Sequence, residues 1–327
     1  MNYIQNSPEI LVDFLNYMQA IKGRSEKTVN EYFLDLRNFL RYQKMIKTET
    51  DRPLREISIN DIDITFIKSI TLSDIYSYLT YLAREREVRQ NSKNTDYGIS
   101  GLSRSRKASA IRSFYKYLHE KAGLLDENLA ARLDMPKSRK KLAKHLTLDE
   151  SVNLLKNINS DKNTQRDHCI ITIFLNCGLR VSELVGINLD DIRQDYIRVL
   201  GKGDKERIVY INQACKNAID EYLQMRPKEG LADPRAMFIS RKSKRISAST
   251  VKWLVKKHLA NAGLDTKALS THKLRHTAAT LMYQNGVDLR TLQEILGHEN
   301  LNTTQIYTHI DNKSKKEAAD KNPLSDL

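Results

Sequence analysis

Four short clusters in the C-terminal half of the chain combine cationic, imidazole and phenol side chains. They are Gly178-Leu179-Arg180-Val181-Ser182-Glu183, Gly201-Lys202-Gly203-Asp204, His272-Lys273-Leu274-Arg275-His276, and Leu296-Gly297-His298 with Ile306-Tyr307-Thr308-His309. Cleavage of a phosphodiester needs an in-line nucleophile, cations on the non-bridging oxygens and an acid for the leaving oxygen. Together the clusters contain side chains for each of these tasks.

Two arginines are candidates for binding a phosphate. Arg275 lies three residues after His272, so the two side chains share one face of a predicted helix. Arg180 lies where one helix is predicted to end, after Gly178, and another to begin. Two guanidinium groups can bind a phosphate through paired hydrogen bonds. Lys202, at the tip of a predicted hairpin, has an ammonium suited to proton donation.

Other chemistries fit these residues less well. His272 and His276 have the i, i+4 spacing of two zinc ligands, but a zinc protease needs a Glu directly after the first His, where this chain has Lys273. The pair Gly201 and Gly203 is more typical of a tight turn than of a phosphate cradle. Taken one at a time, each candidate side chain also has an ordinary structural explanation. Only their combination indicates phosphoryl chemistry.

The positive charge of the chain is concentrated in parts of the sequence. The 327 residues carry 54 Lys and Arg against 40 Asp and Glu, a net charge of +14. Residues 101–150 contribute +6 (12 against 6), residues 201–250 contribute +5 (11 against 6) and residues 251–300 contribute +3 (7 against 4). This concentration favours surfaces for a polyanion such as nucleic acid. Solvated lysine-rich faces are the alternative.

The N-terminal part is predicted to be all-helical. A first amphipathic helix covers Glu9–Ile21, and a second follows Ser25, which suits an N-cap. Apolar residues at helical spacing mark two further helices, around 72–82 and 111–118. Residues 44–71 are irregular and polar, and they predict a long connection with one short element.

The C-terminal part is predicted to be helical with one β-hairpin. Thr147 and Glu150 form a capping box that starts a new helix directly after a basic segment. Residues 196–200 and 207–211 are β-rich and flank a glycine-containing turn. The predicted fold class is therefore mainly α with a small hairpin in the C-terminal domain. The predicted divisions are a helical domain (1–135), a basic linker (136–146) and a second domain (147–327).

Two basic segments are candidates for contact with DNA phosphates. The segment Ser103-Arg104-Ser105-Arg106-Lys107 opens a predicted helix, where hydroxyls, cations and free backbone N–H groups can bind phosphate together. An ordinary capped helix with a solvated first turn is the alternative. The linker carries four more cations without an acid between them: Lys137, Arg139, Lys140 and Lys141.

Composition also bears on the cellular compartment. No apolar run approaches the ~18 residues of a membrane span, and the start of the chain lacks the features of a secretory signal. The three cysteines, Cys169, Cys177 and Cys215, are too few for a disulfide framework and match no zinc spacing. These features predict a cytoplasmic protein without a membrane association.

The clusters, taken together, resemble the tyrosine recombinase/integrase family, most of all its Xer-type members. The strongest matches are GLRVSEL, GKGDKER, HKLRHTAAT and LGHENLNTTQIYTH. The resemblance covers nearly the whole chain and is specific, because the catalytic side chains and their flanks occur in the order of the family. It implies a two-domain DNA breaking-rejoining architecture with a SAM-like, DNA-binding N-terminal domain.

The resemblance implies roles around the scissile phosphate. Arg180 and Arg275 would clamp the phosphate and stabilise its pentavalent transition state. His298 would donate one further hydrogen bond to it. Glu183 matches an acidic position that orients the site without contacting the DNA.

It also implies roles for the groups that make and break bonds. Tyr307 would be the nucleophile, leaving a 3′-phosphotyrosine and a free 5′-hydroxyl. Lys202 would protonate the leaving 5′-oxygen, and His272 would assist removal of the proton from Tyr307. No metal or other cofactor is implied, because the covalent link conserves the energy of the broken ester.

The partners implied are double-stranded DNA with a short inverted-repeat core site and a homotetramer on that DNA, in which the tail 312–327 docks on a neighbouring subunit. A second recombinase in a hetero-tetramer and a DNA translocase are further possibilities. Chromosome dimer resolution and integration or excision of a mobile element both remain open as biological roles. Two alternatives also remain, a type IB topoisomerase-like enzyme and a non-catalytic DNA-binding protein on the same fold.

Overall fold

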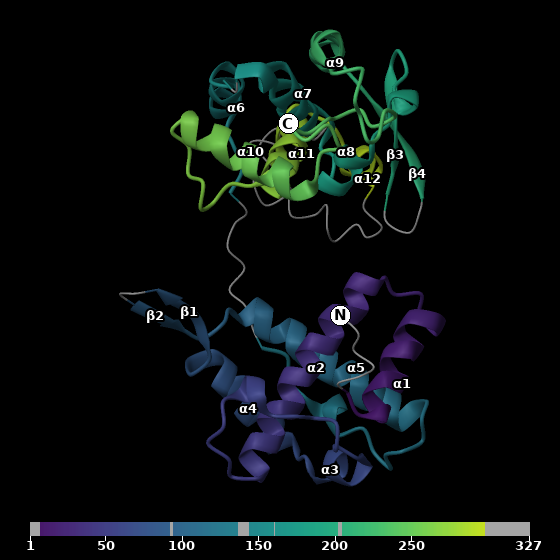
Figure 1. Cartoon of the computed structure of the whole chain (residues 1–327), viewed down its shortest axis with the longest axis vertical. Coiled ribbons are helices and arrows are strands. Elements are labelled where there is room, and N and C mark those ends of the chain that lie inside the picture. Colours follow the sequence, from purple (N-terminus) through teal and green to yellow (C-terminus); the bar gives the residue numbers. More distant parts are fainter. Residues whose placement is uncertain (1–6, 92–93, 137–143, 160, 202–204, 298–327) are drawn as a thin grey trace, which may run out of the picture. The chain divides into compact units, whose positions relative to one another are not determined.

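The computed structural model describes residues 7–91, 94–136, 144–159, 161–201 and 205–297. The chain divides into two compact units, Met1–Lys141 and Leu142–Leu327, here called the N-terminal and C-terminal units (Figure 1). The division falls inside the predicted linker, 136–146. None of the described helices is both long enough and apolar enough to cross a membrane.

The N-terminal unit is built mainly of helices. Its elements are α1 (Glu9–Asn16), a π-helical turn (Tyr17–Ile21), α2 (Glu26–Lys47), a 3₁₀ turn (Leu54–Glu56), α3 (Ile64–Ser69), α4 (Leu72–Arg84), β1 (Glu87–Asn91), β2 (Asn94–Tyr97), α5 (Gly101–Glu120) and a 3₁₀ turn (Leu129–Arg132). Ser25 caps α2 as predicted, since its hydroxyl accepts the N–H of Thr28. The segment 44–71 includes the end of α2, the first 3₁₀ turn and the short helix α3.

The hairpin of β1 and β2 corrects the prediction of an all-helical N-terminal part. Its strands pair antiparallel, with Glu87 opposite Tyr97 and Asn91 opposite Asn94. The sequence of these strands is polar and lacks the alternation of apolar and polar residues that marks a half-buried strand. The hairpin depends on local pairing and on the backbone at Gly98, where the chain returns to α4.

The backbone of Gly98 lies very close to the backbone of α4. Its φ is +80°, and a Cβ at this position would lie 2.1 Å from the carbonyl oxygen of Ala83. Gly98→Ala is therefore expected to lower the free energy of unfolding of the N-terminal unit by at least about 2 kcal/mol, from strain and steric overlap. The matched control is Gly123→Ala, because Gly123 has φ +63° and open space around it. Denaturant unfolding of both variants tests this, and equal losses would contradict the close approach.

The core of the N-terminal unit is rich in aromatic side chains. Phe14 of α1 packs edge-on against Phe114 of α5, with ring centroids 5.3 Å apart. Phe39 of α2 packs in the same way against Tyr78 of α4, at 5.4 Å. All four side chains are buried. These contacts hold four helices around one core, which leaves the polar faces of α2 and α5 outward.

The described part of the C-terminal unit is mainly helical with a two-stranded sheet, as predicted. Its elements are α6 (Leu148–Lys156), a 3₁₀ turn (Asp161–Asn163), α7 (Thr164–Cys177), α8 (Val181–Gly186), a 3₁₀ turn (Leu189–Asp191), β3 (Tyr196–Leu200), β4 (Glu206–Tyr210), α9 (Gln213–Met225), α10 (Ala248–Asn261), α11 (Thr271–Gln284) and α12 (Leu289–Leu296). The predicted capping box is confirmed, because Thr147 and Glu150 exchange hydrogen bonds at the start of α6.

Helix α7 is the centre of this unit. Most of its side chains are buried, and it packs against α9 on one side and α11 on another. The β3–β4 hairpin lies at the edge of the unit (Figure 1). Its register pairs Tyr196 with Tyr210 and Val199 with Arg207, so Ile197, Val199 and Val209 point into the core. The central helix thus ends, at Cys177, beside the helix that carries His272 and Arg275.

Candidate active site

Three arginines surround the buried carboxylate of Glu183. The Glu183 side chain is 1 % exposed, and it caps α8, where its Oε2 accepts the backbone N–H of Arg180 at 2.7 Å. Its Oε1 accepts Nη1 of Arg180 at 2.8 Å and Nη1 of Arg207 at 2.7 Å. Arg207 Nη2 donates to Oε2 at 3.1 Å, and Arg275 Nη1 lies 3.7 Å from the same oxygen. One negative charge therefore organises three positive charges.

A left-handed glycine brings these residues together. Gly178 ends α7 with φ +60°, and a Cβ there would lie 2.9 Å from Leu296 Cδ2, 3.6 Å from Ala278 Cβ and 3.8 Å from Arg275 Cγ. The end of α7 thus lies directly against α11 and α12. Because Arg180 follows two residues later as the residue before α8, it lies beside Arg275, 95 positions further along the chain.

The arginines also bind the C-terminal end of α12. Arg275, which is 3 % exposed, donates to the carbonyl of Gly178 at 2.8 Å and to that of Leu296 at 2.6 Å. Arg180 Nη2 donates to the carbonyl of Gly297 at 3.0 Å. Cations at a helix C-terminus are favourable because the unpaired carbonyls there carry partial negative charge. The backbone that leads into His298 is therefore fixed to both arginines.

His272 lies at the solvent-facing side of this cluster, one turn before Arg275 on α11. Partial burial lowers the pKa of its imidazole, and the positive charges of Arg275, Lys273 and Arg180 lower it further. Its pKa is thus below the ordinary value of about 6.5. The ring is mainly neutral at pH 7, the form that can accept a proton.

Burial raises the pKa of Glu183, but the hydrogen bonds from Arg207 and Arg180 outweigh burial and hold the pKa below its ordinary value. The carboxylate is thus ionised across the neutral range. This charge offsets part of the mutual repulsion of the three arginines. The cluster keeps a net positive charge where a phosphate would bind.

Three of the predicted catalytic side chains lie outside the described residues: Lys202, His298 and Tyr307. For Lys202 and His298, the residue directly before each is described and lies at the cluster. A Cβ at Gly201, directly before the hairpin tip, would lie 4.0 Å from Glu183 Oε1. Gly297, the other neighbour, accepts a hydrogen bond from Arg180. The structure therefore brings Arg180, Glu183, His272 and Arg275 together and leaves the other three as predictions.

The predicted DNA contacts of the N-terminal unit lie at the start of α5. Arg106 is exposed and pairs with Asp35, and Arg104 is half-buried and donates to the carbonyl of Ile99. Lys107 is buried, and its Nζ lies 2.5 Å from Asp35 Oδ1, so its ammonium has a carboxylate partner within the unit. Contact of these cations with DNA stays a prediction. The linker cations lie outside the described residues: Lys137, Arg139, Lys140 and Lys141.

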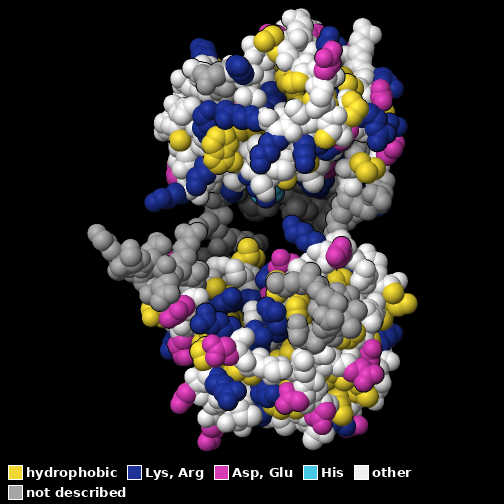
Figure 2. Space-filling model, viewed as in Figure 1, with side chains coloured by type: hydrophobic (Ala, Val, Ile, Leu, Met, Phe, Trp, Pro, Cys, Tyr) yellow, Lys and Arg dark blue, Asp and Glu magenta, His cyan; other side chains and the backbone are white. Residues whose placement is uncertain are grey.

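Positive charge also gathers on the C-terminal unit. Figure 2 shows many Lys and Arg side chains on the face that carries α10. Two lysines of α10, Lys252 and Lys256, are exposed. Such a face is suited to a polyanion.

Sequence reasoning missed Arg207. The signal was available, because Arg207 occupies an inward position on β4, in register with Val199 and two residues before Val209. A charged side chain on the inward face of a strand requires a buried partner of opposite charge. Glu183 is that partner.

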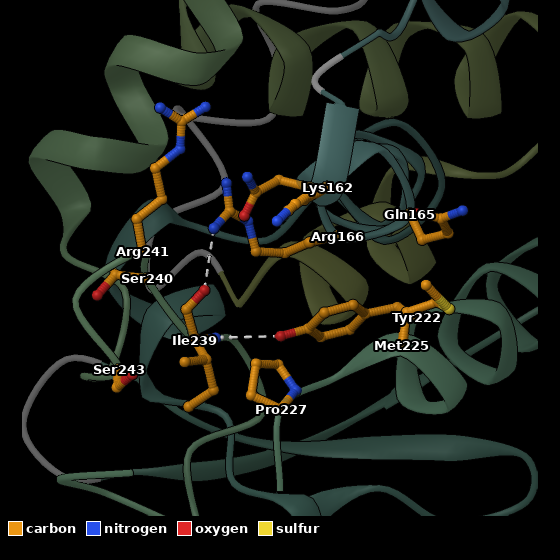
Figure 3. Close-up of a pocket in the computed structure, with 11 residues that line it drawn as sticks. Lys162, Gln165, Arg166, Tyr222, Met225, Pro227, Ile239, Ser240, Arg241 and Ser243 are labelled. Carbon is orange, nitrogen blue, oxygen red and sulfur yellow. Dashed lines mark hydrogen bonds between the residues drawn. The ribbon is translucent and has the colours of Figure 1, made fainter. Parts of the chain in front are cut away.

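A cavity of about 460 Å³ lies elsewhere in the C-terminal unit, between the start of α7, the end of α9 and the segment 239–243 (Figure 3). None of the predicted catalytic residues lines it. Its central side chain, Arg166, donates twice to Asp167 and once to the carbonyl of Ile239, whose N–H donates to the hydroxyl of Tyr222. All three nitrogens of this guanidinium are thus engaged in holding the fold.

In the described part of the chain, no group of three or more His, Cys, Asp or Glu side chains is arranged to hold a metal ion. His276, the second histidine of the i, i+4 pair, is buried, and burial together with nearby Lys273 lowers its pKa to about 4. It is therefore a neutral residue of the α11 core.

Comparison with known proteins gives consistent matches. The model of the phage integrase family matches residues 144–314. A tyrosine recombinase XerC of Caldanaerobacter subterraneus subsp. tengcongensis is 50% identical over 321 residues, covering 97% of this chain and 88% of that protein. A XerC of Thermodesulfovibrio yellowstonii is 35% identical and covers 98% of each chain.

A solved structure shows the same architecture. The pre-cleavage complex of the XerH site-specific recombinase with its difH substrate has a TM-score of 0.67 and 25% identity, covering 95% of this chain and 84% of that one. The family match, the relatives aligned over nearly the whole chain and the arginine cluster all indicate the same kind of protein. This chain belongs to the phage integrase family and is a tyrosine-type site-specific recombinase of the Xer type.

Proposed function

We propose that this recombinase cuts and rejoins DNA strands through a 3′-phosphotyrosine intermediate, within a tetramer bound to two DNA sites. The observation that supports this most directly is the meeting of Arg180 and Arg275 at Glu183, with His272 beside them. Such a cluster suits the developing charge of a pentavalent phosphate. Exchange between two duplexes involves four strands, and four subunits supply one nucleophile for each.

The proposed roles follow the motif positions. Arg180 and Arg275 clamp the scissile phosphate, and His298 adds a hydrogen bond to it. Tyr307 attacks the phosphorus, and its bond to the 3′-phosphate replaces the bond to the 5′-oxygen. Lys202 gives a proton to that oxygen. A tyrosine pKa near 10 leaves about 10⁻³ of the phenol ionised at pH 7, a deficit of roughly 4 kcal/mol that a base and a cationic field must offset.

The proposed DNA surface includes the start of α5, the linker and the basic faces of the C-terminal unit. Arg104 and Arg106 lie at the helix start, and the linker cations follow α5 along the chain. A short inverted-repeat site suits a protein that acts as a symmetric assembly. The XerH structure contains difH DNA, which supports double-stranded DNA as the partner here. We place the reaction in the cytoplasm, in chromosome dimer resolution or in movement of an integrated element.

Covalent capture tests the proposal. The protein is incubated with sheared genomic DNA in EDTA and denatured with detergent, and the attached DNA is sequenced. We expect an adduct enriched for one short inverted-repeat site, and we expect Tyr307→Phe to form none. A single chromosomal site would favour dimer resolution, and the ends of a mobile element would favour transposition.

The same experiment can contradict the proposal. An adduct that persists in Tyr307→Phe would show that another residue is the nucleophile. Absence of any adduct with the wild-type chain would contradict autonomous cleavage. Joining of two sites, as opposed to relaxation of one supercoiled plasmid, separates a recombinase from a topoisomerase-like enzyme.

The pH dependence of cleavage tests the role of His272. Its pKa lies below the ordinary value, so the ring loses its accepting nitrogen only as pH falls through that lowered pKa. We expect single-turnover cleavage to be level near neutral pH and to fall on the acid side, below about 6.5. His272→Gln should lower the neutral rate by roughly 10²-fold or more and remove the acid limb. An unchanged acid limb in His272→Gln would assign it to another group.

A further inference from the structure

Arg207 connects three parts of the active-site region. It belongs to β4, the second strand of the hairpin that flanks the Lys202 tip, and its side chain is 16 % exposed. Its neighbours along the strand, Glu206 and Ile208, face the solvent. The arginine alone among these three turns inward, toward α8 and α12.

The contacts of Arg207 are directional. Its two Nη atoms donate to the two oxygens of Glu183, at 2.7 and 3.1 Å. Its Nε donates to the carbonyl of Ile295 at 3.4 Å. A Cβ at Gly297 would lie 3.1 Å from Cδ and Nε of this arginine, so the side chain packs directly on the backbone that precedes His298. Paired contacts between a guanidinium and a carboxylate fix orientation as well as distance.

Arg180 binds the same carboxylate. Oε1 of Glu183 accepts from both Arg180 and Arg207, and the backbone N–H of Arg180 donates to Oε2. Both guanidinium groups and the backbone N–H of Arg180 therefore restrain the orientation of the carboxylate. The position of the Arg180 guanidinium, and of the α12 end to which it also binds, depends on that orientation.

We propose that Arg207 is a positioning residue for the phosphate clamp, which acts by orienting Glu183 and the C-terminal end of α12 and thereby Arg180. This inference rests on the proposed cleavage function. We assign a positioning role and not direct contact with the phosphate, because all three guanidinium nitrogens of Arg207 donate to protein acceptors, the two oxygens of Glu183 and the carbonyl of Ile295. It also links the hairpin to the clamp mechanically.

The test uses three variants of the full-length chain on a duplex that contains the site found by covalent capture. Arg207→Met removes the charge and the hydrogen bonds but keeps the length of the stem. Arg207→Lys keeps the charge without the paired geometry. Arg198→Met is the control, because Arg198 lies on the opposite strand, is exposed and pairs with Asp191 away from the cluster.

We expect Arg207→Met to lower the single-turnover rate of adduct formation at saturating DNA by about 10²-fold, as for a misplaced catalytic group. Arg207→Lys should be intermediate, and DNA affinity should change less than about threefold in both. Arg198→Met should cleave like the wild type. Unchanged cleavage by Arg207→Met, or a loss that appears only in DNA affinity, would overturn the inference.

Two further readouts separate positioning from a general weakening of the fold. If Arg207 acts through Glu183, the double variant with Glu183→Gln should be no slower than the slower single variant, because the two changes disable one unit. A multiplied loss would overturn the inference. A methylphosphonate at the scissile position is uncharged, so its cleavage depends less on the positive charges of Arg180 and Arg275. The ratio of the wild-type rate to the Arg207→Met rate should therefore be smaller on this substrate than on the natural phosphate. An equal deficit on this substrate would overturn it as well.

Failure of the proposed cleavage function and failure of the inference about Arg207 give different results. If covalent capture with the wild-type chain yields no adduct, the proposed cleavage fails and the inference fails with it. If the wild-type chain cleaves and Arg207→Met cleaves equally well, only the inference fails. If Arg207→Met does not fold, the same measurements on Arg207→Lys decide the result.

Discussion

Arg275→Ala is expected to lower the rate of covalent cleavage at saturating DNA by about 10²–10³-fold, the usual cost of removing one donor to a developing oxyanion. Arg275 is almost fully buried, and its Nη1 lies 3.7 Å from Glu183, so its charge is held in place before DNA binds. Pre-organised charge of this kind needs no rearrangement during the reaction. Rapid-mixing measurement of adduct formation gives the rate.

The same substitution is expected to destabilise the C-terminal unit. It leaves the carbonyls of Gly178 and Leu296 without their donor, at about 1–3 kcal/mol each. Arg226→Ala is the matched control, because Arg226 is also buried in this unit and its described hydrogen bonds go to carbonyls of residues 227–237. We expect both variants to lose stability in denaturant unfolding but only Arg275→Ala to lose cleavage. Equal cleavage by the two folded variants would contradict a role for Arg275 at the phosphate.

Glu183→Ala is expected to lower the free energy of unfolding by about 3–5 kcal/mol, because it leaves two closely paired guanidinium groups, and a third nearby, without their shared counter-charge. Cleavage by the folded fraction should fall by about 10²-fold, since Arg180 loses its orientation. Chemical denaturation and single-turnover cleavage, measured on the same preparation, check the two effects.

Glu183→Gln separates charge from shape. The amide keeps the size of the carboxylate but removes the negative charge, so it should lose less stability than the alanine variant. The pKa of Glu183 is lowered in the folded protein, so the ionised carboxylate stabilises the fold at neutral pH. That contribution is lost as pH falls through the lowered pKa, and the glutamine variant should lack this part of the acid destabilisation. If the wild-type protein and Glu183→Gln lost the same amount of stability on acidification, the result would contradict a stabilising role for the ionised Glu183 carboxylate.

Local sequence alone determined most of the elements. Ser25, Thr147 and Glu150 predicted two helix starts that are present as hydrogen-bonded caps. Apolar spacing predicted the long helices of the N-terminal unit, because a helix must bury one stripe of its surface. The hairpin of the C-terminal unit followed from its β-branched strands and glycine turn. The β1–β2 hairpin was not predicted, because its strands are polar and lack the alternation of apolar and polar residues that indicates a strand.

The motifs identified Arg180, Glu183, His272 and Arg275 as residues of one site, but their sequence spacing could not give their contacts. The meeting of α7, α11 and α12 at Gly178 is a tertiary packing event, and it alone decides that Arg180 and Arg275 share a carboxylate and the end of α12. Arg207 shows the same limit. The sequence shows that this position carries a positive charge. Its partner is a buried carboxylate 24 residues earlier in the chain, and the two meet only when the hairpin packs on α8. Sequence thus determined the chemical groups, and the tertiary structure decided which of them restrain one another.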